Sequence, residues 1–197
     1  MAEKQKRLII GLTGPIAGGK GVVADYLKNQ GFFYCSLSER IREEIRRRGE
    51  EISREKLQKV ADKLRKKFGP AVLAQRTWNL ILKQKSLRIV IDSIRGESEV
   101  DFLKSKPEFF LLGVTAPRKL RYQRVVARNR ESDPPSWEEF LRIDKKDFKS
   151  GQGKLGRDIK KCLEKTDFLI VNDGTVGELK RKIKKILSII ISEKKKG

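Results

Sequence analysis

A lysine that follows closely spaced glycines, in the stretch GPIAGGKGV over residues 14–22, has the residue types of a phosphate-binding loop. In the pattern GxxxxGK, backbone N–H groups surround phosphate oxygens and the lysine reaches the terminal phosphates. The apolar run LIIGLT precedes the loop and a helical pattern follows it, as such a loop requires. We therefore predict a nucleotide site. Its expected contacts are Gly14, Ala17, Gly18, Gly19, Lys20, Gly21 and Val22.

Gly21 stands directly after the lysine, where many phosphate loops carry a Ser or Thr that binds magnesium. The stretch resembles the GxPGxGKGT loop of adenylate kinases and related nucleoside monophosphate kinases, in which a glycine takes that place. Ile16 and Val22 depart from this pattern, at its proline and its threonine. The opening IIGLTGPIAGGK is also similar to that of dephospho-CoA kinases. The resemblance implies ATP as phosphate donor and Mg²⁺ as cofactor.

A kinase with a phosphorylated acceptor needs arginines that neutralise the acceptor's phosphate. The stretch SLSERIR over residues 36–42 is similar to S-x-G-D-x-x-R of monophosphate kinases, which implies Ser38 and Arg42 as acceptor contacts. Ser38 is also expected to be the N-cap of the helix that follows. The alternative for Arg42 is an ordinary solvated position on a charged helix.

The stretch VIDSIRGESEV over residues 90–100 is similar to the family segment D-G-x-(P)-R. This similarity implies Arg95 as a catalytic and acceptor-binding residue. Asp92 follows a buried strand, at the edge of an α/β sheet where ligands gather, so it is the candidate Mg²⁺ ligand, through water. An aspartate at a strand end can also be only a turn former or a helix cap.

A basic helix is expected over RKLRYQRVVARNR, residues 118–130. The equivalent helix of monophosphate kinases carries arginines into a lid, which implies Arg124 and Arg128 as catalytic residues. By the same resemblance, Arg130 and Arg142 are expected to contact the acceptor. The alternative is that this helix presents a basic stripe to nucleic acid, which the sequence favours less.

The stretch VNDGTVGELKRKI over residues 171–183 resembles the loop after the last strand in this superfamily, which borders the nucleotide base. The resemblance implies Asn172, Gly174 and Thr175 as nucleotide contacts. Thr175 is equally consistent with a plain N-cap of the last helix. The longer stretch that begins at GQGKLGRD also resembles dephospho-CoA kinases and a little-characterised archaeal kinase-like group.

Short apolar strands alternate with amphipathic helices along the chain, which predicts an α/β fold with a parallel sheet covered on both faces. We expect one P-loop NTPase domain of three α/β/α layers with a five-stranded parallel sheet. The strands are expected at residues 7–13, 31–36, 87–92, 108–115 and 167–173. The single domain 1–197 is expected to divide into a core (7–36, 86–127, 151–191), acceptor-binding helices (37–85) and a short lid (about 128–150).

The chain has 197 residues and a formal net charge of +21, with no histidine and two cysteines. This composition argues against a zinc site and a disulfide framework. No stretch has the length of a membrane span or the pattern of a signal peptide, so a cytoplasmic protein is expected. The basic charge is interpreted mainly as solvated helix faces, with nucleic acid as a less favoured partner. The oligomeric state is left open.

The leading hypothesis is a phosphotransferase that moves the γ-phosphoryl group of ATP to a nucleoside monophosphate-like acceptor. Dephospho-CoA kinase is the alternative, but an acceptor hydroxyl needs a base, and YCSLSER lacks the Asp-x-Asp pair of those enzymes. An alternative of a different class is a slow NTPase that binds RNA or the ribosome. The net charge and Val22 favour it, whereas the arginines expected for an acceptor phosphate do not.

Overall fold

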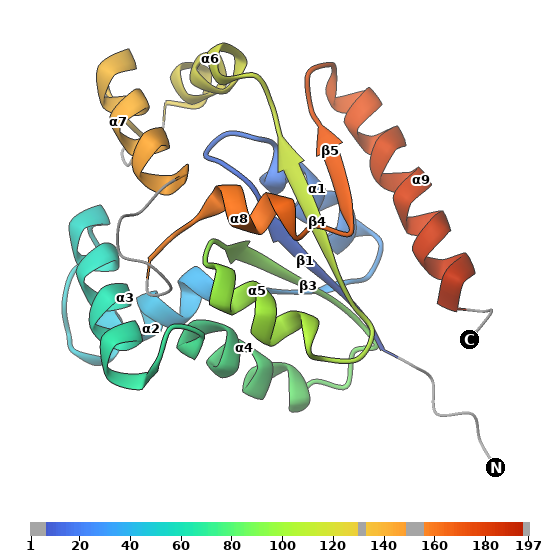
Figure 1. Ribbon diagram of the computed structural model, residues 1–197, viewed down its shortest axis with the longest axis horizontal. Helices are drawn as coiled ribbons and strands as arrows, with labels where there is room; N and C mark the ends of the chain where they lie inside the picture. Colours follow the sequence, from blue (N-terminus) through green and yellow to red (C-terminus); the bar gives the residue numbers. More distant parts are fainter. Residues whose placement is uncertain (1–6, 130–132, 149–155, 195–197) are drawn as a thin grey trace.

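The computed structural model describes residues 7–129, 133–148 and 156–194. A five-stranded parallel sheet in the order β2-β3-β1-β4-β5 forms its centre (Figure 1). The strands are β1 Leu8–Thr13, β2 Phe33–Ser36, β3 Arg88–Ile94, β4 Phe109–Thr115 and β5 Phe168–Val171. They confirm the predicted fold class and lie within two residues of the expected strand bounds at either end.

The helices that surround the sheet follow the expected alternation. They are α1 Lys20–Asn29, α2 Leu37–Arg47, α3 Arg54–Phe68, α4 Val72–Leu82, α5 Glu97–Lys104, α6 Arg118–Arg128, α7 Trp137–Phe148, α8 Ile159–Glu164 and α9 Val176–Lys194. The short helix α8 was not anticipated; its N-cap is Asp158, whose side chain accepts a hydrogen bond from the Lys161 N–H.

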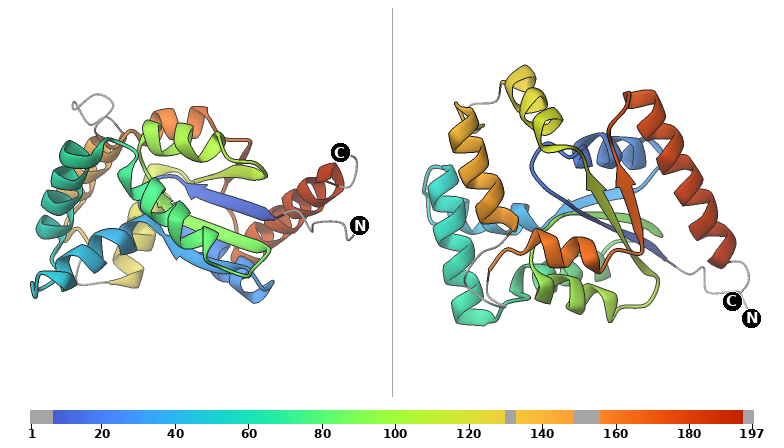
Figure 2. Two further views of the ribbon diagram at one scale, coloured as in Figure 1. Left: turned by 90° about the horizontal axis from the view of Figure 1, so that it is seen from below. Right: turned by 45° about the horizontal axis from the view of Figure 1, so that its top comes forward.

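Two cores lie on opposite faces of the sheet, because successive strand residues point to opposite sides. On one face, strand residues such as Ile9 and Ile91 pack against α2, α4, α5 and α8. On the other face, Ile10 and Val90 pack against α1 and α9. Helix α3 packs outside, against α2 and α4, so α2, α3 and α4 form a helical group at one end of the sheet (Figures 1 and 2).

Helices α6 and α7 lie beyond the carboxyl ends of the strands (Figure 1). Aromatic side chains join the two helices: the Tyr122 ring lies 5.0 Å from that of Trp137 and 5.4 Å from that of Phe140. Phe140 is fully buried in this contact. The expected lid therefore contains a helix that packs firmly on α6, while its assignment as a lid stays a prediction.

The capping of α2 differs from the expectation. Ser36, the last residue of β2, is the N-cap residue, and Ser38 lies in the first turn of the helix. Because α2 begins directly after β2, Ser38 lies within the helix and cannot be the residue that precedes it. The Ser38 hydroxyl is consequently available to other side chains at the sheet edge.

Candidate active site

The phosphate loop connects β1 to α1 and is closely surrounded by neighbouring atoms. Gly14 and Gly19 have φ angles of 135° and 114°, which favour glycine. A Cβ atom at Gly14 or Gly18 would collide with the carbonyl oxygen of Val114, and one at Gly19 would collide with the Asn172 side-chain amide. Close approach of neighbouring atoms therefore requires glycine at all three positions, and the backbone conformation favours it at Gly14 and Gly19 as well.

Lys20 is the first residue of α1 and lines a large cavity at the sheet edge. Its half-buried ammonium group donates hydrogen bonds to the carbonyl oxygens of Gly14 at 2.6 Å and Pro15 at 2.8 Å. Burial, followed by the positive charge of Arg95, lowers the pKa of Lys20 to about 7, although Asp92 opposes this shift. An anion in the loop would favour the charged ammonium form, so Lys20 is poised to respond to phosphate.

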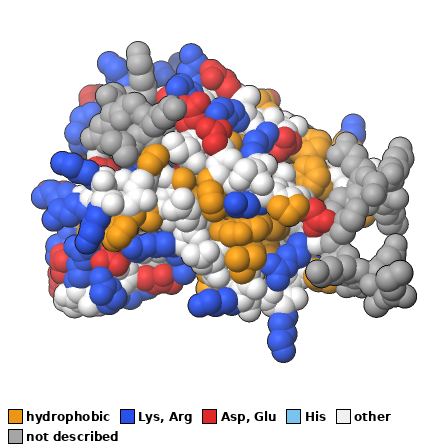
Figure 3. Space-filling model, turned by 60° about the horizontal axis from the view of Figure 1, so that its bottom comes forward, with side chains coloured by type: hydrophobic (Ala, Val, Ile, Leu, Met, Phe, Trp, Pro, Cys, Tyr) orange, Lys and Arg blue, Asp and Glu red, His pale blue; other side chains and the backbone are white. Residues whose placement is uncertain are grey.

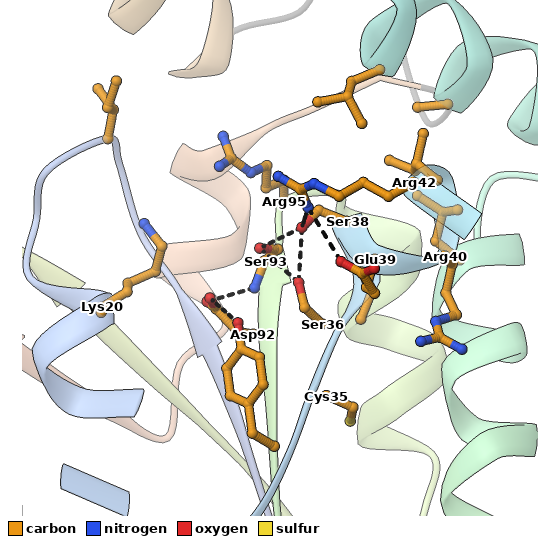
Figure 4. Close-up of a pocket in the computed structure, with 18 of the residues that line it drawn as sticks. Lys20, Cys35, Ser36, Ser38, Glu39, Arg40, Arg42, Asp92, Ser93 and Arg95 are labelled. Carbon is orange, nitrogen blue, oxygen red and sulfur yellow. Dashed lines mark hydrogen bonds and ion pairs between the residues drawn. The ribbon is translucent and has the colours of Figure 1, made fainter. Parts of the chain in front are cut away.

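Gly21 and Val22 also line this cavity. No atom lies within 4 Å of a Cβ atom placed at Gly21, so the absence of a hydroxyl at this position is not caused by crowding. The candidate Mg²⁺ ligand is Asp92 in β3. Its carboxylate accepts hydrogen bonds from the Tyr34 hydroxyl at 3.1 Å and the Ser93 N–H at 2.6 Å. Figure 4 shows Asp92 between Lys20 and the side chains of Ser36 and Ser93.

Three serine hydroxyls cluster where β2 and β3 end. Ser36 Oγ lies 2.9 Å from Ser38 Oγ and 3.1 Å from Ser93 Oγ, and Arg42 Nη1 donates to Ser38 Oγ at 2.8 Å (Figure 4). Ser93 has a φ angle of 66°, in the left-handed region that a non-glycine residue rarely adopts. This strained backbone sits at the position where the resembling family segment carries glycine, which gives a physical reason for that glycine.

Arg95 is held from two directions at the edge of the cavity. Its guanidinium Nη1 donates to Asp147 Oδ2 at 3.0 Å, and its backbone N–H donates to Glu99 Oε2 at 3.0 Å. The fully buried Glu99 also pairs with Arg65 of α3 at 3.0 Å. Asp147 is buried too, and accepts from Arg157 at 2.8 Å. Helices α3, α5 and α7 thus fix Arg95 together.

The arginines of α6 have different surroundings. Arg121 is buried, pairs with Asp144 at 2.6 Å and donates to the Ile16 carbonyl of the phosphate loop at 3.3 Å. Arg124 lines the cavity and donates through Nη2 to the Asn172 carbonyl at 3.0 Å. Its Nη1 is buried and, among the described residues, has no hydrogen-bond partner. Burial lowers the pKa of Arg124, and an anion beside it would offset this effect by favouring the charged guanidinium.

Arg128 lines the same cavity from the end of α6, where it pairs with Asp133 at 2.6 Å. Arg40 was not anticipated, yet it lines the cavity, and its Nε is buried without a partner among the described residues. Arg157 reaches the site through its ion pair with Asp147. Nothing in local spacing marks these last two arginines as site residues.

One expected acceptor contact, Arg142, lies away from the cavity. Arg142 pairs with Glu139 on the exposed side of α7, opposite the buried Asp144 and Asp147, so the structure does not bring it to the cavity. Arg130 lies outside the described residues.

Asn172, Gly174 and Thr175, the expected base contacts, lie in the loop between β5 and α9. Asn172 is buried and donates through Nδ2 to the Gly18 carbonyl at 3.0 Å, which supports the phosphate loop from behind. Thr175 and Glu178 cap α9 reciprocally, at 2.7 Å and 3.2 Å. Gly174 and Thr175 are exposed, and neither lines the cavity. Contacts to a base through this loop stay a prediction.

The fold and the loop together define a protein with the P-loop kinase fold. A shikimate kinase from Acinetobacter baumannii aligns with a TM-score of 0.57 and 20% identity, over 96% of each chain. A dephospho-CoA kinase from Campylobacter jejuni aligns with a TM-score of 0.51 and 16% identity, over 93% of this chain and 97% of that one. The expected likeness to dephospho-CoA kinases therefore holds for the fold.

Sequence relatives identify the family within the class of P-loop kinase folds. A UPF0200 protein of Pyrococcus abyssi is 36% identical over 191 residues, covering 93% of this chain and 97% of the relative. A UPF0200 protein of Methanothermobacter thermautotrophicus is 33% identical over 181 residues, covering 91% of this chain and 89% of the relative. The chain belongs to the UPF0200 family. No protein-family model matches it. Within the described residues, no helix is long and apolar enough to cross a membrane.

Proposed function

We propose that this protein is an ATP-dependent phosphotransferase that transfers the γ-phosphoryl group to a nucleoside monophosphate-like acceptor. The observation that carries the proposal is a single cavity of about 1150 Å³ that reaches from the phosphate loop to α2 and α3. Lys20 and Arg124 line its donor side, and Ser38, Arg42 and Arg95 line its acceptor side. Such a volume accommodates two substrates side by side.

In the proposed reaction, an oxygen of the acceptor phosphate attacks the γ-phosphorus of ATP. The bond from the γ-phosphorus to the bridging oxygen breaks, and ADP leaves with that oxygen. Because the acceptor oxygen is already anionic, no general base is needed, and catalysis consists of positioning and charge neutralisation. Lys20, Arg124 and Arg95 would neutralise the charge on the transferring group, while Arg42 and Ser38 would hold the acceptor.

The residues present fit Mg²⁺ of the kind that accompanies ATP. Mg²⁺ keeps several waters and is held through one or two carboxylates and the substrate phosphates, so Asp92 alone is a sufficient protein group. No cluster of three metal-binding side chains exists among the described residues, which is consistent with a metal that arrives with the nucleotide. When bound, Mg²⁺ would neutralise charge on the β- and γ-phosphates.

A hydroxyl acceptor, as in dephospho-CoA kinase, is the second candidate, because the fold is shared with kinases of that kind. A hydroxyl acceptor would need a carboxylate base. β2 ends in Ser36 rather than in an acidic residue, and the nearby Glu39 is paired with Arg46 at 2.6 Å. Of the carboxylates that line the cavity, Glu39, Asp133 and Asp147 are paired with arginines, and Asp92 is assigned here to Mg²⁺. This leaves arginines and hydroxyls for the acceptor, which favours a phosphate acceptor.

The test is a coupled ADP-release screen across ribo- and deoxyribonucleoside monophosphates and dephospho-CoA. At least one monophosphate should raise the rate well above that with water alone. Arg42→Ala should raise the KM for that acceptor while leaving the KM for ATP nearly unchanged, and Lys20→Ala should abolish turnover with every acceptor. A rate equal to the water rate with all acceptors would refute the proposal, and a response to dephospho-CoA alone would support the second candidate.

A further inference from the structure

A second hollow lies on the outer side of the helical group α2, α3 and α4. It has a volume of about 450 Å³ and shares no lining residue with the cavity of the phosphate loop. We call it the basic groove; its lining residues are Glu44, Arg47, Arg48, Lys63, Leu64, Lys66, Lys67, Phe68 and Arg76. Figure 3 shows Lys and Arg side chains gathered at the end of the molecule that holds α2 and α3.

One buried carboxylate organises the arginines of the basic groove. Glu44 accepts hydrogen bonds from Arg47 at 2.9 Å and Arg48 at 2.8 Å, and lies 3.6 Å from Arg76. The hydrogen bonds from Arg47 and Arg48 lower the pKa of Glu44 to about 2, so it stays ionised at neutral pH. Among the described lining residues Glu44 is the single acid, so the groove keeps a large positive excess.

An exposed aromatic ring lies among these cations. Phe68, the last residue of α3, is 50% exposed. The Lys67 ammonium lies 5.1 Å from the centre of its ring, and the Arg76 guanidinium lies 5.3 Å from it. A cation near the C-terminus of α2 or α3 interacts favourably with the helix dipole on whichever side of the helix end it lies. The dipoles do not account for their convergence with Lys63, Arg76 and a half-exposed ring on one hollow.

This combination matches the chemistry of one class of ligand. Cations that follow a phosphate backbone, together with an aromatic side chain on which a base stacks, are the elements by which proteins bind single-stranded nucleic acid. Each guanidinium carries several N–H donors, so Arg47, Arg48 and Arg76 keep donors for phosphate oxygens beside those that Glu44 accepts. We propose that the basic groove binds single-stranded nucleic acid, with phosphates on its lysines and arginines and one base stacked on Phe68.

The proposal does not depend on the phosphotransferase, because the two cavities have separate linings. Its test is fluorescence anisotropy with labelled single-stranded RNA and DNA of about ten nucleotides, a length within the usual site size, and with the matching duplexes for comparison. Phe68→Ala should weaken binding by between about fivefold and about a hundredfold without changing the salt dependence, since the variant removes a stacking surface but no charged group. Phe68 is half exposed, so this variant should fold normally.

The electrostatic contribution is tested by charge-matched triple variants. Lys63→Gln/Lys66→Gln/Lys67→Gln should weaken binding and lower the slope of log K against log salt by about 2, near 0.7 for each phosphate that a lysine no longer neutralises. The control Lys180→Gln/Lys184→Gln/Lys185→Gln removes the same charge from exposed positions of α9, and should change both quantities much less.

Three results would overturn the proposal. The first is equal loss of binding in the two triple variants, which would mean attraction to the net charge alone. The second is unchanged binding in Phe68→Ala, which would leave a site for phosphate groups without base stacking. The third is equal affinity for duplex and single strand, since the bases of a duplex are not open to the ring. A difference between the RNA and DNA arms would identify the natural strand.

Discussion

The low pKa of Lys20 predicts that phosphate binding takes up a proton. With a pKa of about 7, roughly one-tenth of the lysine is charged at pH 8 and roughly nine-tenths at pH 6 in the protein without ligand. A nucleotide phosphate in the loop stabilises the ammonium form, because an opposite charge within contact distance raises the pKa of a lysine. Binding should therefore be coupled to uptake of about 0.9 proton at pH 8 and about 0.1 proton at pH 6.

The sign of the effect on affinity follows from the same linkage. Only the ammonium form neutralises the phosphate, so affinity should be nearly constant below pH 7 and fall as pH rises above it. The fall is about tenfold, or about 1.4 kcal/mol, for each pH unit until the pKa of the complex is reached. Isothermal titration calorimetry of the Mg²⁺–nucleotide complex, in buffers of different ionisation enthalpy, measures the proton uptake directly.

The control is Lys20→Gln, measured at the same pH values, because protons exchanged by the nucleotide itself appear in both proteins. The difference between wild type and variant belongs to the lysine. If that variant binds too weakly, a pH titration of the free Mg²⁺–nucleotide complex supplies the correction instead. Uptake that stays the same between pH 6 and pH 8 would refute the reasoning, since it would mean that Lys20 is already fully charged without ligand.

Three further substitutions test other parts of the site. Ser93→Gly should be more stable to urea than Ser93→Ala by about 1 kcal/mol, because both lack the hydroxyl but only glycine tolerates the left-handed backbone; equal stability would contradict the strain. Gly21→Ser should lower the Mg²⁺ concentration that gives half-maximal ATP turnover, whereas Gly21→Ala should not; equal titrations would show that the new hydroxyl does not reach the metal. Asp147→Asn should strengthen binding of inorganic phosphate to the free protein, seen as a larger thermal shift, because it removes a competitor for Arg95; an unchanged shift would mean that Arg95 does not meet the anion.

The fold and the phosphate loop were predictable because their signals are local. Apolar strands, amphipathic helices and the glycine spacing around Lys20 each lie within a few consecutive residues, and each specifies an element whose place in a parallel sheet follows from chain order. Asp92 could be placed beside the loop by the same rule, since the ends of neighbouring strands meet at one edge. The division of the chain into core, acceptor-binding helices and lid stays a prediction.

The support for Arg95 was not predictable, because its partners are distant in sequence. Asp147 lies 52 positions away, and Glu99 holds an arginine that lies 34 positions away in α3. No spacing rule links such residues, and a charged chain offers many equivalent pairs. The position of Arg142 was hard to foresee for a related reason. A helical pattern shows which residues share a face, but the buried face of α7 includes Asp144, an acid that pattern analysis reads as exposed. The acceptor contact of Arg142 stays a prediction.

The crowding of the phosphate loop limits how this family can change. The atom that excludes a side chain at Gly18 is the carbonyl oxygen of Val114, and every residue that replaces Val114 would carry the same oxygen. No second substitution at that position can relieve the collision, so a saturation library should recover only glycine at 18, whatever accompanies it. The end of β4 thus constrains the phosphate loop, although among the described residues it contributes no side chain to the cavity.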